Sequence, residues 1–545
     1  MLSDIEVAQT SLLMQDVQRE IDRYDEEIDR LSITLEKLKV TRDSLQNHKD
    51  RYSLVCAPVR KLPLEILTEI FERCCEDGGL LIYRFGDEGD VATPALSLSQ
   101  TCSYWREILL SQPKLWSKFY INLIMGDRTR IKSLVDLYLT RSEGGPGLNL
   151  DISARTRGGN LLVTLGFAAW SIFISLLEAS GRWLEASFYI RWDLYLAMKV
   201  DSLGLDCDNL QSLSLKWQSD YHPTITPPFF RALVDTPSLR SLTLQSFCPD
   251  FPFAYQNLQK FESRFFVLSD LSSFLAAYPE IEDMVVDIDH DPDPDLEETP
   301  DSGDLGVPRV IFGNIRSLRY HTVHPEFIYK VIPNFTFPAL TMLDLHCFWA
   351  TEWQHAMTES LKTMLQSLGR QLNTLKLRGR LVENDQELIN VLSLAPAVRA
   401  FTLDPWRCYQ NILTDKFFRD LSFAPLQPDT SSDSVAKDII LPQLETFHLG
   451  FGEDFHGHFN KNPALPNVKA IISMIDSRRL AVHFSGVEVK KLSHFSLYFC
   501  GERDGAGPHW IQTFTSGLGP RLSSFWRDGL QVSLDFELQI ERLDS

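Results

Sequence analysis

The chain lacks the short motifs that most often carry catalytic or cofactor chemistry. It contains no G-x-x-x-x-G-K-[ST] or G-x-G-x-x-G phosphate loop, no H-E-x-x-H zinc motif and no G-x-S-x-G nucleophile turn. The 13 histidines do not group with Cys or Asp at convincing metal spacing, and the nearest case, His456 and His458 after Asp454, is a weak signal. Catalytic groups can converge from distant segments, but no motif argues for them. We therefore expect no catalytic residue, no metal and no cofactor.

A surplus of basic residues is also absent. Lys and Arg together number 53 against 73 Asp and Glu, which gives a net charge of −20. This balance disfavours general binding to nucleic acid or to an anionic membrane surface, because both require a basic face. The nine cysteines are scattered and form no C-x-x-C pair, which favours reduced thiols in the cytoplasm or nucleus over a disulfide framework. The first 16 residues show no secretory-signal pattern.

One strongly apolar stretch of the chain is free of charge. Residues 161–177, "LLVTLGFAAWSIFISLL", carry no charged side chain, and their length is at the lower limit for a membrane span. Thr164, Gly166, Ser171 and Ser175 dilute the apolar character, and no basic clusters flank the stretch. We interpret it as a buried helix, with a membrane span as the less favoured alternative.

An acidic stretch lies in the middle of the chain, at residues 287–304. Its alternating Asp residues are similar to a calcium-binding loop, but Pro292 stands where such a loop needs Gly. The composition instead predicts a disordered acidic loop.

The first 50 residues carry a heptad repeat. Apolar residues alternate three and four positions apart from Met14 to Leu45, interrupted only by Arg42, and no Pro or Gly intervenes. This predicts a coiled-coil helix over residues 1–50. Isoleucines at position a with leucines at d favour a parallel pair. Two alternatives remain: the helix pairs with another chain, such as a second copy in a homodimer, or it folds back on the segment that follows. Pro58 predicts that it ends before that residue.

Residues 62–116 predict two amphipathic helices. Pro63 suits the first turn of a helix, and Ile66, Leu67, Ile70, Phe71 and Cys74 follow at helical spacing. A second helix is predicted from the same spacing of Leu98, Cys102, Trp105, Ile108 and Leu109, and Pro113 ends it before Leu115 and Trp116. The Gly- and Asp-rich segment between them, "EDGGLLIYRFGDEGDVATP", is predicted to be a loop.

The runs "APVRKLPLEILTEIF" and "SLSQTCSYWREILLSQPKLW" resemble the F-box family, in particular fungal F-box-like proteins. The resemblance implies an F-box domain over residues 58–120 that docks on the Skp adaptor of an SCF ubiquitin ligase, and so reaches a cullin scaffold. Docking would use apolar helix-in-groove contacts. Some of these side chains must instead form the domain's own core. The candidates for the adaptor contact are Leu62, Pro63, Ile66, Leu67, Ile70, Phe71, Leu98, Cys102, Trp105, Leu115 and Trp116.

The rest of the chain, residues 130–545, repeats a unit of apolar helix followed by a short leucine strand. Examples are "LVDTPSLRSLTL", "FLAAYPEIEDMVV" and "VLSLAPAVRAFTL", with looser copies beginning at Leu210, Leu340, Leu372, Leu444 and Leu492. We predict an α/β fold in the form of an irregular solenoid that resembles leucine-rich repeats, with parallel strands on its inner face. An unrelated α/β domain is the alternative. The Asn or Cys that follows the strand in that family is missing, since Phe247 and Arg380 stand at two of the matching positions.

Side chains between the strand leucines point away from the core. Those of Lys216, Thr243, Gln245, Lys376, Arg378 and His448 would line the inner face, where they are candidates for binding a target protein. The leading hypothesis is therefore a substrate-recognition adaptor that makes or breaks no covalent bond itself. A scaffold without a role in ubiquitin transfer and an enzyme hidden in the C-terminal body are the alternatives.

Overall fold

The structure is a computed structural model of the whole chain. It describes residues 4–55, 58–76, 79–85, 88–123, 129–154, 167–190, 195, 205–217, 228–231, 233, 236–247, 257–264, 271, 274, 277–288, 310–322, 328, 335–347, 355–368, 370–404, 412–423, 439–452, 467–479, 482–484, 487–501, 522, 525 and 530–538. The chain divides into two compact units. The helical unit comprises residues 1–79 and 93–115, and the sheet unit comprises residues 80–92 and 116–545.

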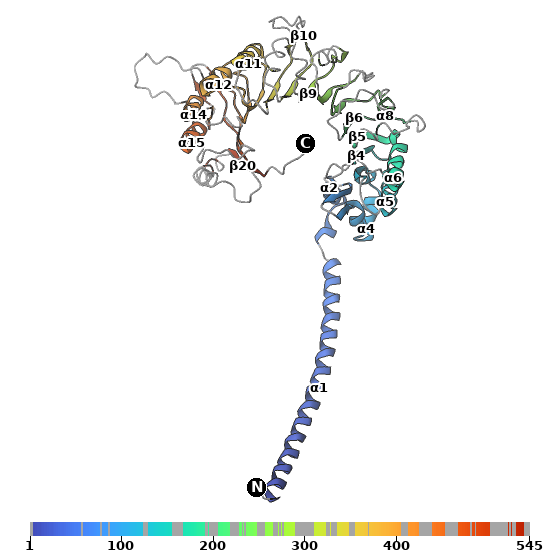
Figure 1. Cartoon of the computed structure of the whole chain (residues 1–545). Helices are drawn as coiled ribbons and strands as arrows, with labels where there is room; N and C mark the ends of the chain where they lie inside the picture. Colours follow the sequence, from blue (N-terminus) through green and yellow to red (C-terminus); the bar gives the residue numbers. More distant parts are fainter. Residues whose placement is uncertain are drawn as a thin grey trace. The chain divides into compact units, whose positions relative to one another are not determined.

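The helical unit begins with α1 (Asp4–Val55), a single helix of 52 residues that Figure 1 shows without interruption. The predicted helix is confirmed, and it ends before Pro58 as expected. The 3₁₀ turn η1 (Pro58–Lys61) leads into α2 (Leu64–Glu76), which starts directly after Pro63 and carries Glu65 in its first turn, where a carboxylate is favourable.

The predicted second helix is wrong in one respect, because it is two helices. These are α3 (Pro94–Ser99) and α4 (Ser103–Leu110). Cys102 lies between them in extended conformation, and its sulfur accepts a hydrogen bond from the amide of Trp105 at 3.5 Å, so it caps α4. The 3₁₀ turn η2 (Pro113–Trp116) follows.

The segment between α2 and α3, expected to be a loop, contains two strands. β1 (Leu80–Phe85) and β2 (Glu88–Ala92) form an antiparallel pair, and β1 also pairs in parallel with β3 (Lys118–Asn122). The apolar run "LLIYRF" buries Leu80 and Ile82 in the sheet unit. Its neighbour β3 is distant in sequence, so the local Gly and Asp composition was a misleading guide.

The sheet unit contains a sheet of 16 strands. It begins β2-β1-β3, and from β3 on each strand lies beside its neighbour along the chain, with only β10, β12, β17 and β18 left out. All pairs in this sheet except β1 with β2 are parallel. The further strands are β4 (Leu148–Ser153), β5 (Trp183–Ile190), β6 (Ser212–Trp217), β7 (Ser241–Leu244), β8 (Lys260–Arg264), β9 (Asp283–Ile288), β11 (Ser317–Thr322), β13 (Met342–Cys347), β14 (Thr374–Gly379), β15 (Ala400–Asp404), β16 (Thr446–Gly452), β19 (His494–Gly501) and β20 (Gln531–Leu538).

Two short pairs stand apart from this sheet: β10 (Val310–Ile311) with β12 (Phe335–Thr336), and β17 (Val482–Phe484) with β18 (Val487–Val489). The helices of the unit are α5 (Thr129–Arg141), α6 (Phe167–Glu178), α8 (Pro228–Arg231), α11 (His355–Leu368), α12 (Asp385–Leu392), α14 (Asp415–Leu421) and α15 (Val468–Ser477), with the turn η3 (Ser180–Arg182) before β5. The long helices lie along one face of the sheet in Figure 1. The mixed α/β class is thus confirmed.

The core follows from the strand period of two. On nearly every described strand, buried side chains alternate with half-buried ones, as in β9, β11 and β14. Because the strands are parallel and in register, the buried residues form rows across the sheet: Leu375, Phe401, Phe447 and Phe495 are successive partners. The rings of Phe401 and Phe447 stack with centroids 5.5 Å apart.

Two predictions on unusual stretches fall partly outside the described residues. Of the uncharged run 161–177, the part from residue 167 lies in α6, whose Ile172, Phe173, Leu176 and Leu177 are buried as expected for a core helix. No helix among the described residues combines the length and apolarity of a membrane span. The acidic segment 287–304 begins in β9, and its residues from 289 on lie outside the described part, as do His456 and His458.

Candidate functional site

Helix α2 carries two apolar stripes, each spaced by four residues. Leu67, Phe71 and Cys75 form the first stripe and are buried, at 0%, 1% and 4% exposure. The helix packs against α3 and α4, and the Phe71 ring meets Trp105 edge-to-face at 5.0 Å. These side chains therefore hold the helical unit together.

The second stripe is displaced by one position around α2 and faces solvent. It consists of Ile66 at 48% exposure and Ile70 at 38%, with the exposed Cys74 continuing it. Leu64, at the start of the helix, is also exposed. Exposed isoleucines one turn apart form an apolar strip that a partner can cover, and we call Ile66 and Ile70 the docking stripe. Leu64 lies two residues before Ile66 and therefore on another side of the helix.

The other candidates for the adaptor contact also divide into buried residues and residues that are at least partly exposed. Leu115 and Trp116 are buried, and the Trp116 ring packs on Tyr138 of the sheet unit at 4.9 Å. Pro63 is exposed, whereas Leu62, Leu98, Cys102 and Trp105 are half-buried. An ion pair of 3.2 Å between Lys114 and Glu72 joins η2 to α2. The structure thus leaves the docking stripe and Pro63 as the exposed part of the predicted surface.

Helix α1 keeps its heptad seam exposed. The apolar residues at positions a and d, from Met14 to Leu45, are each between 46% and 69% exposed. The helix therefore does not fold its seam back onto the described part of the helical unit, and this favours pairing with another chain over the alternative of folding back.

The six candidates for target binding all lie on the half-exposed face of the sheet or directly after a strand. Lys216 is on β6, Thr243 is on β7, and Gln245 follows β7. Lys376 and Arg378 are on β14, and His448 is on β16, where its ring contacts the Ser496 hydroxyl. The structure brings the candidates into two groups, because β8, β9, β11 and β13 separate β7 from β14.

Arg378 belongs to a larger polar cluster, formed by β9, β11, β13 and β14. The Arg378 guanidinium lies 3.5 Å from the carboxylate of Asp344, whose side chain is only 3% exposed. Arg319 lies 3.6 Å from Asp283 in the same way. One oxygen of Asp344, Oδ1, accepts no hydrogen bond from the described residues. The half-exposed face therefore contains a buried carboxylate among guanidinium groups.

Two histidines complete this cluster. His321 and His346 are register partners, and their rings meet edge-to-face at 5.6 Å. Burial, together with the charges of His321 and Arg378, lowers the pKa of His346 to about 3. Burial likewise lowers the pKa of His321. Both rings are thus neutral at pH 7, and the cluster carries its charge on the arginines and carboxylates.

Sequence reasoning missed Asp344, His321 and His346. The signal was present, because Asp344 and His346 occupy the alternate positions of "LTMLDLHC", a strand that was correctly predicted. The alternation that made Lys376 and Arg378 candidates for the half-exposed face of the sheet also places Asp344 and His346 on that face.

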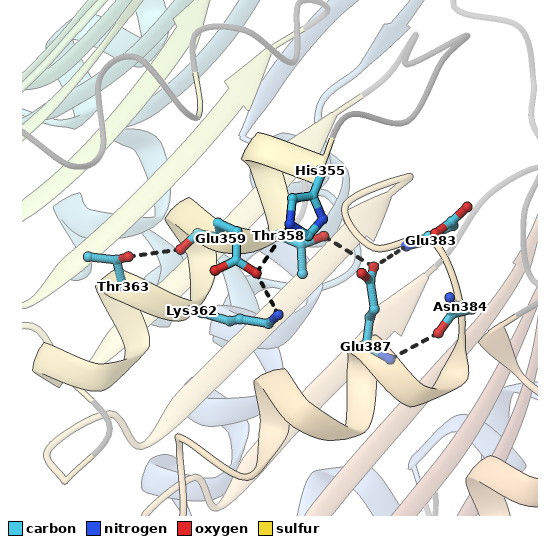
Figure 2. A network of polar contacts seen from close by, with 8 residues as sticks. All are labelled: His355, Thr358, Glu359, Lys362, Thr363, Glu383, Asn384 and Glu387. Atoms are coloured by element: carbon cyan, nitrogen blue, oxygen red, sulfur yellow. Dashed lines mark hydrogen bonds and ion pairs between the residues drawn. The ribbon is translucent and has the colours of Figure 1, made fainter. Parts of the chain in front are cut away.

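A second polar network joins α11 to α12 on the helical face (Figure 2). Asn384 caps α12 by accepting from the Glu387 amide at 3.0 Å, and the Glu387 carboxylate accepts from the Glu383 amide at 3.2 Å. Thr358 of α11, fully buried, donates to Glu387 at 3.4 Å. On α11 itself, Lys362 donates to Glu359 at 2.7 Å, which lowers the pKa of Glu359. Glu387 of α12 therefore has two roles: it belongs to the N-terminal cap of α12 and accepts a hydrogen bond from α11, which fixes the two helices to each other.

The described part of the chain holds no group of three His, Cys, Asp or Glu side chains that is suited to a metal ion. A hollow of about 350 Å³ lies at the turns that precede β6, β7 and β8, with one charged residue, Arg240, in its lining. It lacks the paired acid and base that general acid–base catalysis uses.

Comparison with known proteins finds no family model that matches this chain and no curated protein that is similar to it. The function must therefore be argued from the residues themselves.

Proposed function

We propose that this chain is an F-box substrate-recognition adaptor of an SCF-type ubiquitin ligase. The observation that carries the proposal is the exposed docking stripe on α2, which lies within the segment that resembles the F-box. The buried stripe beside it accounts for the stability of α2, so Ile66 and Ile70 are not needed for that purpose and remain free for a partner.

The docking stripe has the chemistry of helix-in-groove recognition. Isoleucines at i and i+4 project from one side of a helix and fit a single apolar groove. Each contributes up to about 1.5–3 kcal/mol when fully buried, and less from its half-exposed starting point. Two such anchors supply the central contacts of a small interface, with the Skp adaptor as the proposed partner.

The sheet unit supports the second half of the proposal. Parallel strands that follow chain order from β3 on, with a half-exposed face, are what a leucine-rich-repeat-like solenoid requires. We infer that this face holds the target protein, with the polar cluster around Asp344 and Arg378 among its contacts. The chain would supply proximity to a ubiquitin-conjugating enzyme, which carries out the chemistry, and would perform none itself.

The test compares capture of the purified Skp adaptor by the full chain and by an Ile66→Ala/Ile70→Ala variant. We expect at least about a tenfold loss of affinity, since each truncated anchor is worth on the order of 1 kcal/mol at a partly exposed site. Ile33→Ala is the matched control, because Ile33 is an exposed isoleucine on α1, outside the docking stripe. Equal capture of all three proteins would contradict docking by this stripe.

A second measurement separates the adaptor from a scaffold with no role in ubiquitin transfer. The complex of the chain with the Skp adaptor is mixed with the cullin scaffold and analysed by size-exclusion chromatography. Assembly of all three supports the ligase, whereas exclusion of the cullin supports the scaffold alternative.

A further inference from the structure

The exposed seam of α1 determines how the helix pairs, once the charges beside it are included. Taking Met14 as position a, the heptad continues to Lys49 at a and Tyr52 at d. Positions e and g, which flank the seam, carry few charges: Asp25 and Lys39 at e, and Glu20 and Glu27 at g. These flanking charges set the orientation of a coiled coil, because e and g residues face each other across the pair.

The isoleucines at a and leucines at d favour a parallel pair, but that orientation places like charges together. In register, it sets Arg42 against Arg42 and Lys49 against Lys49 of the second copy, both inside the seam. Across the flank, g pairs with the e position of the next heptad, so that Glu20 faces Asp25 of the other helix twice. No pair of opposite charges offsets these contacts, since Lys39 faces Thr34.

An antiparallel pair removes every one of these conflicts. With Leu31 set against Leu35 of the second copy, the layers continue as Ile28 with Leu38 and Ile21 with Leu45. The same register places Arg42 against Tyr24, where its stem packs and its guanidinium lies near the ring.

The flanks of this antiparallel register are complementary too. In antiparallel pairs e faces e and g faces g, so Asp25 meets Lys39 of the second copy twice. Glu20 meets His48, Ser32 meets its own copy, and Glu27 meets Thr41. Asp25 forms no ion pair within α1 and is available for this contact. Lys39 lies 3.7 Å from Glu36 of its own helix, in an exposed ion pair that is weak enough for a contact with Asp25 of the second copy to replace it.

From these contacts we infer that α1 pairs with a second copy of this chain in an antiparallel coiled coil centred between Ser32 and Thr34. The seam of both helices is then covered over residues 14–52. Val55, which leads into the helical unit, lies beside Ser11 of the second copy. The two Val55 residues are about 66 Å apart, from a helical rise of ~1.5 Å per residue. The dimer therefore carries its two docking stripes on segments that leave opposite ends of the rod.

Charge reversal at Asp25 tests the orientation in the full chain. Sedimentation analysis should give a dimer of twice 62.4 kDa for the parent protein. Asp25→Lys should weaken dimerisation about tenfold or more, because two attractive contacts with Lys39 become repulsive. The double variant Asp25→Lys/Lys39→Asp should restore the parent affinity. Asp29→Lys is the matched control, since the same charge change at position b lies off the seam and should have no effect.

The parallel arrangement predicts the opposite sign. There Asp25→Lys would relieve the contact with Glu20 and tighten the dimer, and this result would overturn the inference. A monomer of 62.4 kDa, or a monomer that captures the helix of a different protein, would overturn it as well.

Cross-linking gives an independent readout, because α1 contains no cysteine. A mixture of Ile21→Cys and Leu45→Cys chains should form a mixed disulfide, identified by mass spectrometry of the linked peptides. Leu45→Cys alone should form none through this position. Self-linking of Leu45→Cys without mixed linking would establish the parallel pair instead.

Discussion

Arg478 is a fully buried arginine that holds three segments of the sheet unit together. Its guanidinium donates to the carbonyl oxygens of Leu421 and Leu441 at 2.9 Å each, and of Ile440 at 2.6 Å. It also lies over the Phe423 ring at 4.6 Å. Burial lowers its pKa to about 9, so it stays charged at pH 7. Arg478 therefore ties the ends of α14 and α15 to the chain before β16.

Replacing Arg478 with Met keeps the apolar volume and removes all three hydrogen bonds. Each lost bond costs about 1 kcal/mol or more where a carbonyl remains buried, so the local free energy of opening should fall by about 3 kcal/mol. Because the chain is too large for two-state unfolding, hydrogen exchange of the α15 amides is the suitable assay. The expected change is an acceleration of roughly 100-fold at pH 7.

The neighbouring residue gives a matched control. Arg479 is partly exposed and pairs with Asp476 at 3.1 Å, so Arg479→Met should cost less than about 1 kcal/mol. Equal exchange rates in the two variants would show that the buried hydrogen bonds of Arg478 are not what stabilises this part of the sheet unit.

Three further predictions concern the two units. Leu67→Ala should destabilise the helical unit by about 2–5 kcal/mol and Ile70→Ala by less than about 1 kcal/mol, measured by native-state hydrogen exchange; similar values would refute the division into buried and exposed stripes. Gly379→Ala should cost ~2 kcal/mol or more, because φ is +82° and the new Cβ would meet the Cys347 carbonyl; Gly313→Ala, with open space around it, should be nearly neutral in the same assay. The pKa of His346 is lowered to about 3, so the unfolded segment takes up a proton at higher pH than the folded one does. The free energy of opening should therefore fall by up to ~1.4 kcal/mol per pH unit below about 6.5, as measured by hydrogen exchange of the β13 amides at pH 7 and 5 after correction for intrinsic exchange rates. His346→Asn should lose that contribution, and an unchanged pH dependence would contradict it.

The elements of this fold were predictable where the pattern was long and local. The heptads of α1 and the leucine strands, such as those at Leu242 and Leu375, needed only their own periodicity. Prediction failed where the deciding neighbour is distant, as at β1, which pairs with β3 across the intervening helices. It also failed between α3 and α4, where Cys102 turns out to be a cap.

For the candidate site, the limit is different. Ile66, Leu67, Ile70 and Phe71 are all apolar and all lie within one side of a helix, so periodicity places them on one broad face. Which half of that face is covered depends on where α3 and α4 pack, and this information is not contained in α2. The distinction matters for function, because truncating Leu67 or Phe71 removes core packing as well as any contact with a partner. A loss of adaptor capture by such a variant would have two explanations, whereas a loss caused by Ile66 and Ile70 has one. The exposed stripe, rather than the most apolar residues of the helix, is therefore the place where the docking hypothesis can fail.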